Sequence, residues 1–88
     1  MALGAAGSSL AAELNRLAGI STPTSFLAEQ GAANAYAGTS GKGIIAALNY
    51  KASSSRQPTE YKGLNAICNE LASSSGLSAI AALRSINL

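Results

Sequence analysis

The stretch Asn34-Ala35-Tyr36-Ala37-Gly38-Thr39-Ser40-Gly41 sets an asparagine four residues before a glycine and follows it with turn-forming residues. Its first five residues fit the phrase Asn-x-x-Ala-(Gly or Ser), which occurs four times in this chain of 88 residues. The four copies begin at Asn15, Asn34, Asn49 and Asn69. Repetition at intervals of 15 to 20 residues indicates a row of short, similar elements rather than one catalytic fold.

Proline and Gly/Ser clusters divide the chain into five segments of about ten to fourteen residues, each with the apolar spacing of a helix. In the first segment, about residues 9–18, leucines share one face, and Gly19 supplies the left-handed residue that often closes a helix. Thr22 and Pro23 predict the N-cap and first turn of a second helix, which we expect to end at Gly38.

The remaining segments have similar helix-start signals. Thr39 and Ser40 are available to cap a third helix, and Thr59 with Glu60 directly behind it predicts the start of a fourth. A final helix carries Leu77 and later aliphatic residues. No alternating β-branched run and no Asn-Gly or Asp-Gly turn occurs. The sequence therefore predicts an all-α chain of about five short helices, packed either as a compact bundle or as a small solenoid-like array.

The repeated asparagine requires a reason, because its amide competes with the backbone and makes it a poor residue inside a helix. One hypothesis is that each asparagine bridges to the turn or backbone of the adjoining unit and so builds a polar ladder along the array. The alternative is that asparagine only weakens a helix end before a turn. Three tyrosines near the repeats are further candidates for interaction, facing either a partner or the core: Tyr36, Tyr50 and Tyr61.

Size and composition favour a small domain that gains stability by assembly. We expect residues 1–8 to form a flexible N-terminal arm and residues 9–88 to form a single helical-repeat domain. The hydrophobic 48% is dominated by alanine, and tryptophan is absent, so each side chain buries little area. Small residues let helices lie close to a neighbour. The sequence therefore indicates a homo-oligomer or a protein bound within a larger lattice.

Charge and hydropathy argue against two classes of partner. The net charge of +2 is spread along the chain, and the nearest approach to a nucleic-acid footprint is Lys51, Arg56 and Lys62 beside Tyr50 and Tyr61. Solvated helix ends and a loop explain those residues better, so we expect no specific nucleic-acid binding. The longest uncharged stretch, residues 71–83, is too polar and too short to span a bilayer, and residues 1–9 lack the basic region and long apolar core of a secretion signal, so we expect no membrane partner.

The residues that most enzymes need are missing. With no histidine and no aspartate, the chain lacks the usual general base, metal ligand and triad member, so we expect no catalysis, no metal and no cofactor. Cys68 lies in an apolar helical stripe and is expected to be a buried structural thiol. Residues 38–43 resemble a phosphate loop only superficially, because the spacing is wrong and no strand precedes them.

The repeats resemble those in small virion proteins of tailed phages that infect actinobacteria. The similarity covers most of residues 10–73 and is carried by five runs: Ala11–Gly19, Gly31–Gly41, Ala46–Ala52, Tyr61–Asn65 and Cys68–Ala72. Copies three and four depart from the pattern, since they end in serine triplets. The resemblance implies a structural protein located in the virion. The resemblance points first to a minor capsid or decoration protein that binds the major capsid protein or other virion proteins, and less strongly to a tail component.

Two other classes of function stay open at this point. A membrane-active, bacteriocin-like peptide would also be small, mildly cationic and rich in alanine and glycine, although the glutamates and the Ser/Pro breaks argue against it. A small helical adaptor that offers a groove to a partner is the other alternative.

Overall fold

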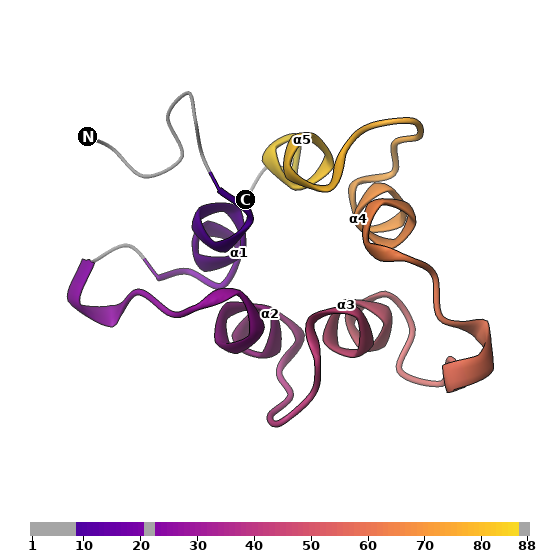
Figure 1. Ribbon diagram of the computed structural model, residues 1–88, viewed down its shortest axis with the longest axis horizontal. Helices are drawn as coiled ribbons and strands as arrows, with labels where there is room; N and C mark the ends of the chain where they lie inside the picture. The colour runs from indigo at the N-terminus through magenta and orange to yellow at the C-terminus, as the bar shows by residue number, and fades with distance from the viewer. Residues whose placement is uncertain (1–8, 21–22, 87–88) are drawn as a thin grey trace.

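Five short helices follow one another around a ring (Figure 1). The computed structural model describes residues 9–20 and 23–86. The α-helices are α1 (Leu10–Leu17), α2 (Glu29–Ala37), α3 (Ile44–Ala52), α4 (Leu64–Ala72) and α5 (Ala79–Arg84), and two short 3-10 turns are η1 (Pro23–Ser25) and η2 (Pro58–Glu60). No strand occurs in this described part of the chain, so the all-α prediction is confirmed. The predicted arm, residues 1–8, lies outside the described residues.

All five helices point in the same direction. The first residues of α1, α2, α3 and α4 line one pocket, so these four helices begin on the same side of the ring, and contacts between neighbouring helices agree with this. At the C-terminal ends, Arg16 in α1 donates to the Leu83 carbonyl of α5 at 2.8 Å, and the Lys51 ammonium of α3 lies 4.8 Å from the Tyr36 ring of α2. At the N-terminal ends, the Asn65 side chain of α4 accepts from the first backbone N–H of α5. The ring therefore has an N-terminal face and a C-terminal face, and each connecting loop returns along the outside (Figure 1).

The core consists of layers stacked along this common direction. The first, fifth and eighth helical positions share one stripe, because steps of four and three return to the same side of a helix. The fifth positions form a middle layer that is completely buried: Leu14, Ala33, Leu48, Cys68 and Leu83. A fully buried leucine stabilises the fold by about 2–3 kcal/mol. The ring is therefore closed around a continuous apolar centre, as in a short solenoid whose two ends meet.

Three of the predicted helix starts are wrong, and the error has one cause. The Pro23 and Thr59 segments form only the 3-10 turns η1 and η2, and α3 begins after Gly43 without a side-chain cap from Thr39 or Ser40. In each loop, the asparagine of the preceding helix holds the backbone two residues before the next helix. Because that backbone is occupied by an external partner, the helix starts only after it. Thr22 lies outside the described residues.

The fifth helix also begins later than the sequence suggests. Leu77 precedes α5 and donates its backbone N–H to the Asn69 side chain, while Ser78 is the N-cap and accepts from the Ala81 N–H at 3.3 Å. Since Leu77 is held by this contact, it cannot belong to the helix. The predicted apolar positions Ile80 and Leu83 do lie in α5 and pack in or against the core.

The helix ends explain how serine replaces glycine in the later copies. Gly19 has a φ angle of 82°, so the left-handed closure predicted there is confirmed, and Gly38, where the second helix was predicted to end, is also left-handed with φ 75°. Ser73 takes the same conformation with φ 57°, although a side chain disfavours it. Ser53 avoids it and is extended, with φ −158°. The third loop therefore leaves its helix along a different path from the other three.

Candidate functional site

The four repeated asparagines make one and the same contact. Each is the sixth residue of its helix, and its side-chain amide both donates to the carbonyl and accepts from the N–H of one loop residue, at 2.8–3.2 Å. The asparagine and loop residue pairs are Asn15 with Leu27, Asn34 with Lys42, Asn49 with Lys62, and Asn69 with Leu77. The side-chain amide thus pairs with the N–H and C=O of the loop residue, as a neighbouring strand would do in a β-sheet. We call this contact the asparagine bridge.

Each bridge also uses the rest of the amide. The second amide hydrogen is donated to the carbonyl four residues earlier in the same helix, at 2.7–2.8 Å in all four copies. In three copies the side-chain oxygen accepts a further bond, from Thr39, Arg56 or Ser74. All four asparagines are buried, Asn15 and Asn49 completely. Buried polar groups are costly unless paired, and in this protein the pairing is what attaches each loop to its helix.

The four asparagine bridges together correspond to the polar ladder that the repeated asparagines suggested. Each bridge joins one helix to the loop that leads into the next helix. A weakened helix end would not require two backbone contacts in the following loop. Only asparagine fits the arrangement, because aspartate lacks the two donors and glutamine is one methylene longer. The repeated phrase therefore encodes a folding element, and its asparagine side chains are fully engaged inside the protein.

The three tyrosines are not brought together into one site. Tyr36 is partly buried against the core, and burial raises the pKa of its hydroxyl. Tyr50 is 39% exposed and lies under the Lys42 ammonium, which is 5.3 Å from the ring centroid. Tyr61 follows η2, where its backbone N–H donates to the Pro58 carbonyl. Each tyrosine thus belongs to a separate local contact.

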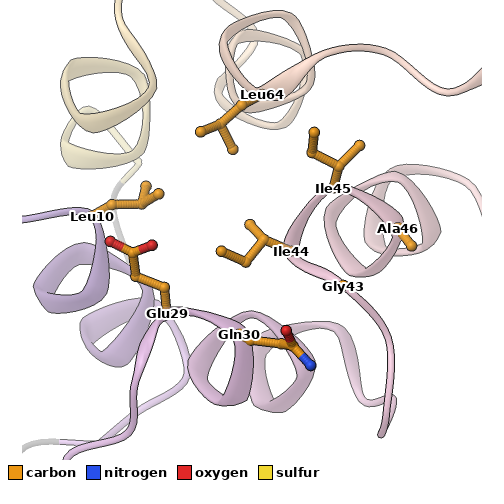
Figure 2. Close-up of a pocket in the computed structure, with 8 residues that line it drawn as sticks. All are labelled: Leu10, Glu29, Gln30, Gly43, Ile44, Ile45, Ala46 and Leu64. Carbon is orange, nitrogen blue, oxygen red and sulfur yellow. The ribbon is translucent and has the colours of Figure 1, made fainter.

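An open pocket of about 410 Å³ lies on the N-terminal face. Figure 2 shows Leu10, Ile44 and Leu64 reaching toward one another across it, with the Glu29 carboxylate at its edge beside Leu10. The pocket exists because the first layer of the core is incomplete: α2 contributes Glu29 and α5 contributes only an alanine where the other helices have large aliphatic residues. Ile45 lines the pocket and is 41% exposed. Sequence reasoning did not predict this pocket, since it depends on which helices face one another.

A charged cluster lies between α1 and α5. The Glu13 carboxylate is only 1% exposed, and it lies 3.1 Å from Arg16 Nε and 3.6 Å from Arg84 Nε. Arg16 also donates to the backbone carbonyls of Leu83 and Ile86 at the end of α5, at 2.8 and 3.0 Å. We call these contacts the clasp. The sequence contains one sign of the clasp: Glu13 occupies the fourth helical position, where α2 to α5 have alanine or isoleucine.

A second charged cluster attaches the long loop between α3 and α4. Arg56 donates to Glu70 at 2.9 Å and to the bridging oxygen of Asn49 at 3.1 Å, and the Lys62 ammonium lies 2.8 Å from Glu70. The hydrogen bonds from Arg56 and then Lys62 hold the pKa of the Glu70 carboxyl below its usual range. These three charged residues therefore pair with one another and hold the loop against α4.

Cys68 lies in the completely buried middle layer, as the sequence predicted. Burial raises the pKa of its thiol to about 11, so the thiol stays protonated at neutral pH and is a poor nucleophile. Among the described residues, no three histidine, cysteine or acidic side chains are grouped to hold a metal ion.

No family model matches the chain, and no curated protein or solved structure matches it. In the described part of the chain, none of the helices has the length and apolar character needed to cross a membrane.

Proposed function

We propose that this chain is a non-enzymatic structural protein of a phage particle that binds the capsid lattice in many copies as a minor capsid or decoration protein. The observation that carries the proposal is the repeated asparagine phrase. This phrase carries the resemblance to small virion proteins of actinobacterial phages, and each of its copies makes the same structural contact. A chain whose distinctive residues all build the scaffold is suited to a structural role.

The N-terminal face is the surface that such a protein would offer to the lattice. The molecule measures 39 × 28 × 18 Å, and the short dimension runs along the helices, so this face is broad relative to the thickness. It holds the apolar pocket and exposes Ile45 at the edge. We propose that aliphatic side chains of the major capsid protein, or of another virion protein, complete the unfinished first layer of the core.

Binding of this kind would stabilise the ring. A ligand that binds only the folded state adds RT ln(1 + [L]/Kd) to the free energy of unfolding, about 2.7 kcal/mol at a hundredfold excess over Kd. A lattice supplies many equivalent sites, and the small, alanine-rich core leaves room for such a gain. The expected readout is therefore a higher melting temperature for the bound protein than for the free protein.

The proposal is tested by incubating the purified chain with purified particles that lack it, then measuring bound copies by quantitative mass spectrometry after sedimentation. We expect saturable binding in regular multiples of the lattice symmetry. Ile45→Asp should weaken this binding at least about tenfold, since a buried carboxylate without a partner is costly. Leu77→Asp is the matched control, because Leu77 has a similar exposure of 38% but does not line the pocket. A chain that stays in the supernatant at every concentration would refute the proposal.

A further inference from the structure

The contact between α5 and α1, which we call the seam, closes the ring between two helices that no loop joins. The sixth position of α5 holds Arg84 in place of the bridging asparagine, and the fourth position of α1 holds Glu13 in place of an alanine or isoleucine. Both exceptions to the repeat therefore meet at the seam. The two side chains face each other there, with Arg84 Nε 3.6 Å from the Glu13 carboxylate.

The two edges of the seam are chemically complementary. The edge of α1 offers the Glu13 carboxylate and the guanidinium of Arg16. The edge of α5 offers the guanidinium of Arg84 and the carbonyls of Leu83 and Ile86, which carry the negative end of the helix dipole. Arg16 thus donates hydrogen bonds to the carbonyls of α5, and Arg84 forms an ion pair with the Glu13 carboxylate. Such a surface selects its partner by charge and orientation as well as by apolar contact.

The seam is also the place where the ring can open at the smallest structural cost. Separating α3 from α4, for example, would break the asparagine bridge between Asn49 and Lys62 and the ion pairs of Glu70 with the loop. Separating α5 from α1 breaks the clasp and the local apolar packing, and it leaves all four asparagine bridges in place. Partial opening of this kind is common where one contact is weaker than the rest.

We propose that the seam is a self-association surface, through which α5 of one copy packs on α1 of a second copy. Arg84 of the first copy then reaches Glu13 of the second, and Arg16 of the second copy donates to the α5 carbonyls of the first. The contact joins two different edges, so copies add in one direction and form a larger ring or an open spiral. Within one chain the edges have an effective concentration in the millimolar range, which keeps the dilute protein closed. Crowding of many copies favours the exchange.

Paramagnetic labelling of mixed copies tests this proposal directly. One chain has natural-abundance nitrogen and the substitution Ser85→Cys, which carries a spin label at the exposed C-cap of α5. It is mixed with a second chain that is enriched in nitrogen-15 and has no spin label. Cys68 does not compete for the label, because it is buried and its pKa is raised to about 11. At about 1 mM total protein, near the effective concentration within one chain, we expect broadening of the α1 amides of the nitrogen-15 chain. This broadening should increase with concentration, while α3 amides stay sharp.

Two controls separate the seam from nonspecific association. With Arg84→Glu in the labelled chain and Glu13→Lys in the nitrogen-15 chain, like charges oppose closure within each copy and opposite charges meet between copies, so association should strengthen about tenfold or more. Glu60→Ala, a change at an exposed acid in η2, should leave the association unchanged. A circular chain with residues 88 and 1 joined by a flexible linker should lose the broadening between copies, because the closed ring is then held covalently. Broadening that is absent at about 1 mM, centred on α3, or unchanged by circularisation would overturn the proposal. Particle binding is measured separately, so either idea can fail without the other.

Discussion

The contact between α3 and α4 and the contact between α5 and α1 join neighbouring parallel helices by different means. In the first, Asn49 fixes the backbone of Lys62 in the connecting loop, and the next helix begins two residues later. In the second, the buried Glu13 pairs with Arg16 and Arg84, and no loop contributes. A bridge to the backbone fixes position along the chain, whereas a pair of charged edges fixes only which surfaces meet. We therefore expect mutation to affect the two contacts to different degrees.

Asn49→Ala is expected to destabilise the protein more than any of the substitutions that follow. It removes bonds with both backbone groups of Lys62, the bond to the Ile45 carbonyl and the bond from Arg56, all at a site that is fully buried. At about 1 kcal/mol for each bond, the free energy of unfolding should fall by about 3–5 kcal/mol, as measured by urea denaturation.

The control for this substitution is Asn65→Ala. Asn65 is exposed, lies in the neighbouring helix and accepts one bond, from the Ala79 N–H at 2.9 Å. Its replacement should cost only about 1 kcal/mol. If the two substitutions cost the same, the asparagine bridge would not be what holds the units together.

Arg16→Ala should have the next largest effect, and it tests the clasp. The change leaves the Glu13 carboxylate buried with only Arg84, at 3.6 Å, and it removes two donors from the α5 carbonyls. Stranding a buried charge is costly, so we expect a loss of about 2–4 kcal/mol in the free energy of unfolding, again measured by urea denaturation. The double variant Glu13→Ala/Arg16→Ala removes the stranded charge and should recover part of this loss. A double variant that is less stable than Arg16→Ala would contradict the argument.

Stability at alkaline pH tests the middle core layer, which contains the Cys68 thiol and lies between the asparagine bridges and the clasp. The pKa of the Cys68 thiol is about 11 in the folded protein and ordinarily 9.0, so the unfolded chain releases its proton first. The stability from this group is complete below pH 9, and it decreases as the pH rises through about 11, by a total of about 2–3 kcal/mol. Chemical denaturation at several pH values measures the slope. Cys68→Ala should reduce that slope, and an unchanged slope would assign it elsewhere, for example to Tyr36.

Ser73→Gly should have the smallest effect, and its sign sharpens the comparison among the loops. Ser73 has a left-handed φ of 57°, as Gly38 does in the equivalent place, so glycine relieves strain there. We expect a gain of about 0.5–1 kcal/mol in the free energy of unfolding. Ser53→Gly is the matched control, because Ser53 is extended with φ −158°. There glycine should be neutral or slightly destabilising, and thermal melting of both variants distinguishes the two outcomes.

The local features of this protein were predictable from the sequence because they depend on neighbouring residues. The apolar spacing specified the helices, and Gly19 and Gly38 marked left-handed ends because only glycine adopts that conformation without strain. The recurrence of asparagine suggested the ladder, since a residue that disfavours helices returned to one helical position four times. The burial of Cys68 followed from its place in the apolar stripe.

The helix starts were the local features that sequence reasoning missed. Pro23, Thr39 and Thr59 are all good start signals by themselves. They failed because the loop backbone near each start is bonded to an asparagine of the preceding helix, 8 to 13 residues earlier in the chain. A partner at that distance outweighs the local preference of a single capping residue.

What the sequence determined by itself is the kind and number of its elements and the residue that links them. The tertiary structure decided that all five helices run in one direction, that α5 meets α1, that Glu13 is buried against two arginines and that the first core layer stays open as a pocket. The physical reason is the range of the interactions. Helical spacing and turn conformation are set within a few residues, whereas the direction of packing and the closure of the ring depend on surfaces that meet only after the whole chain has folded.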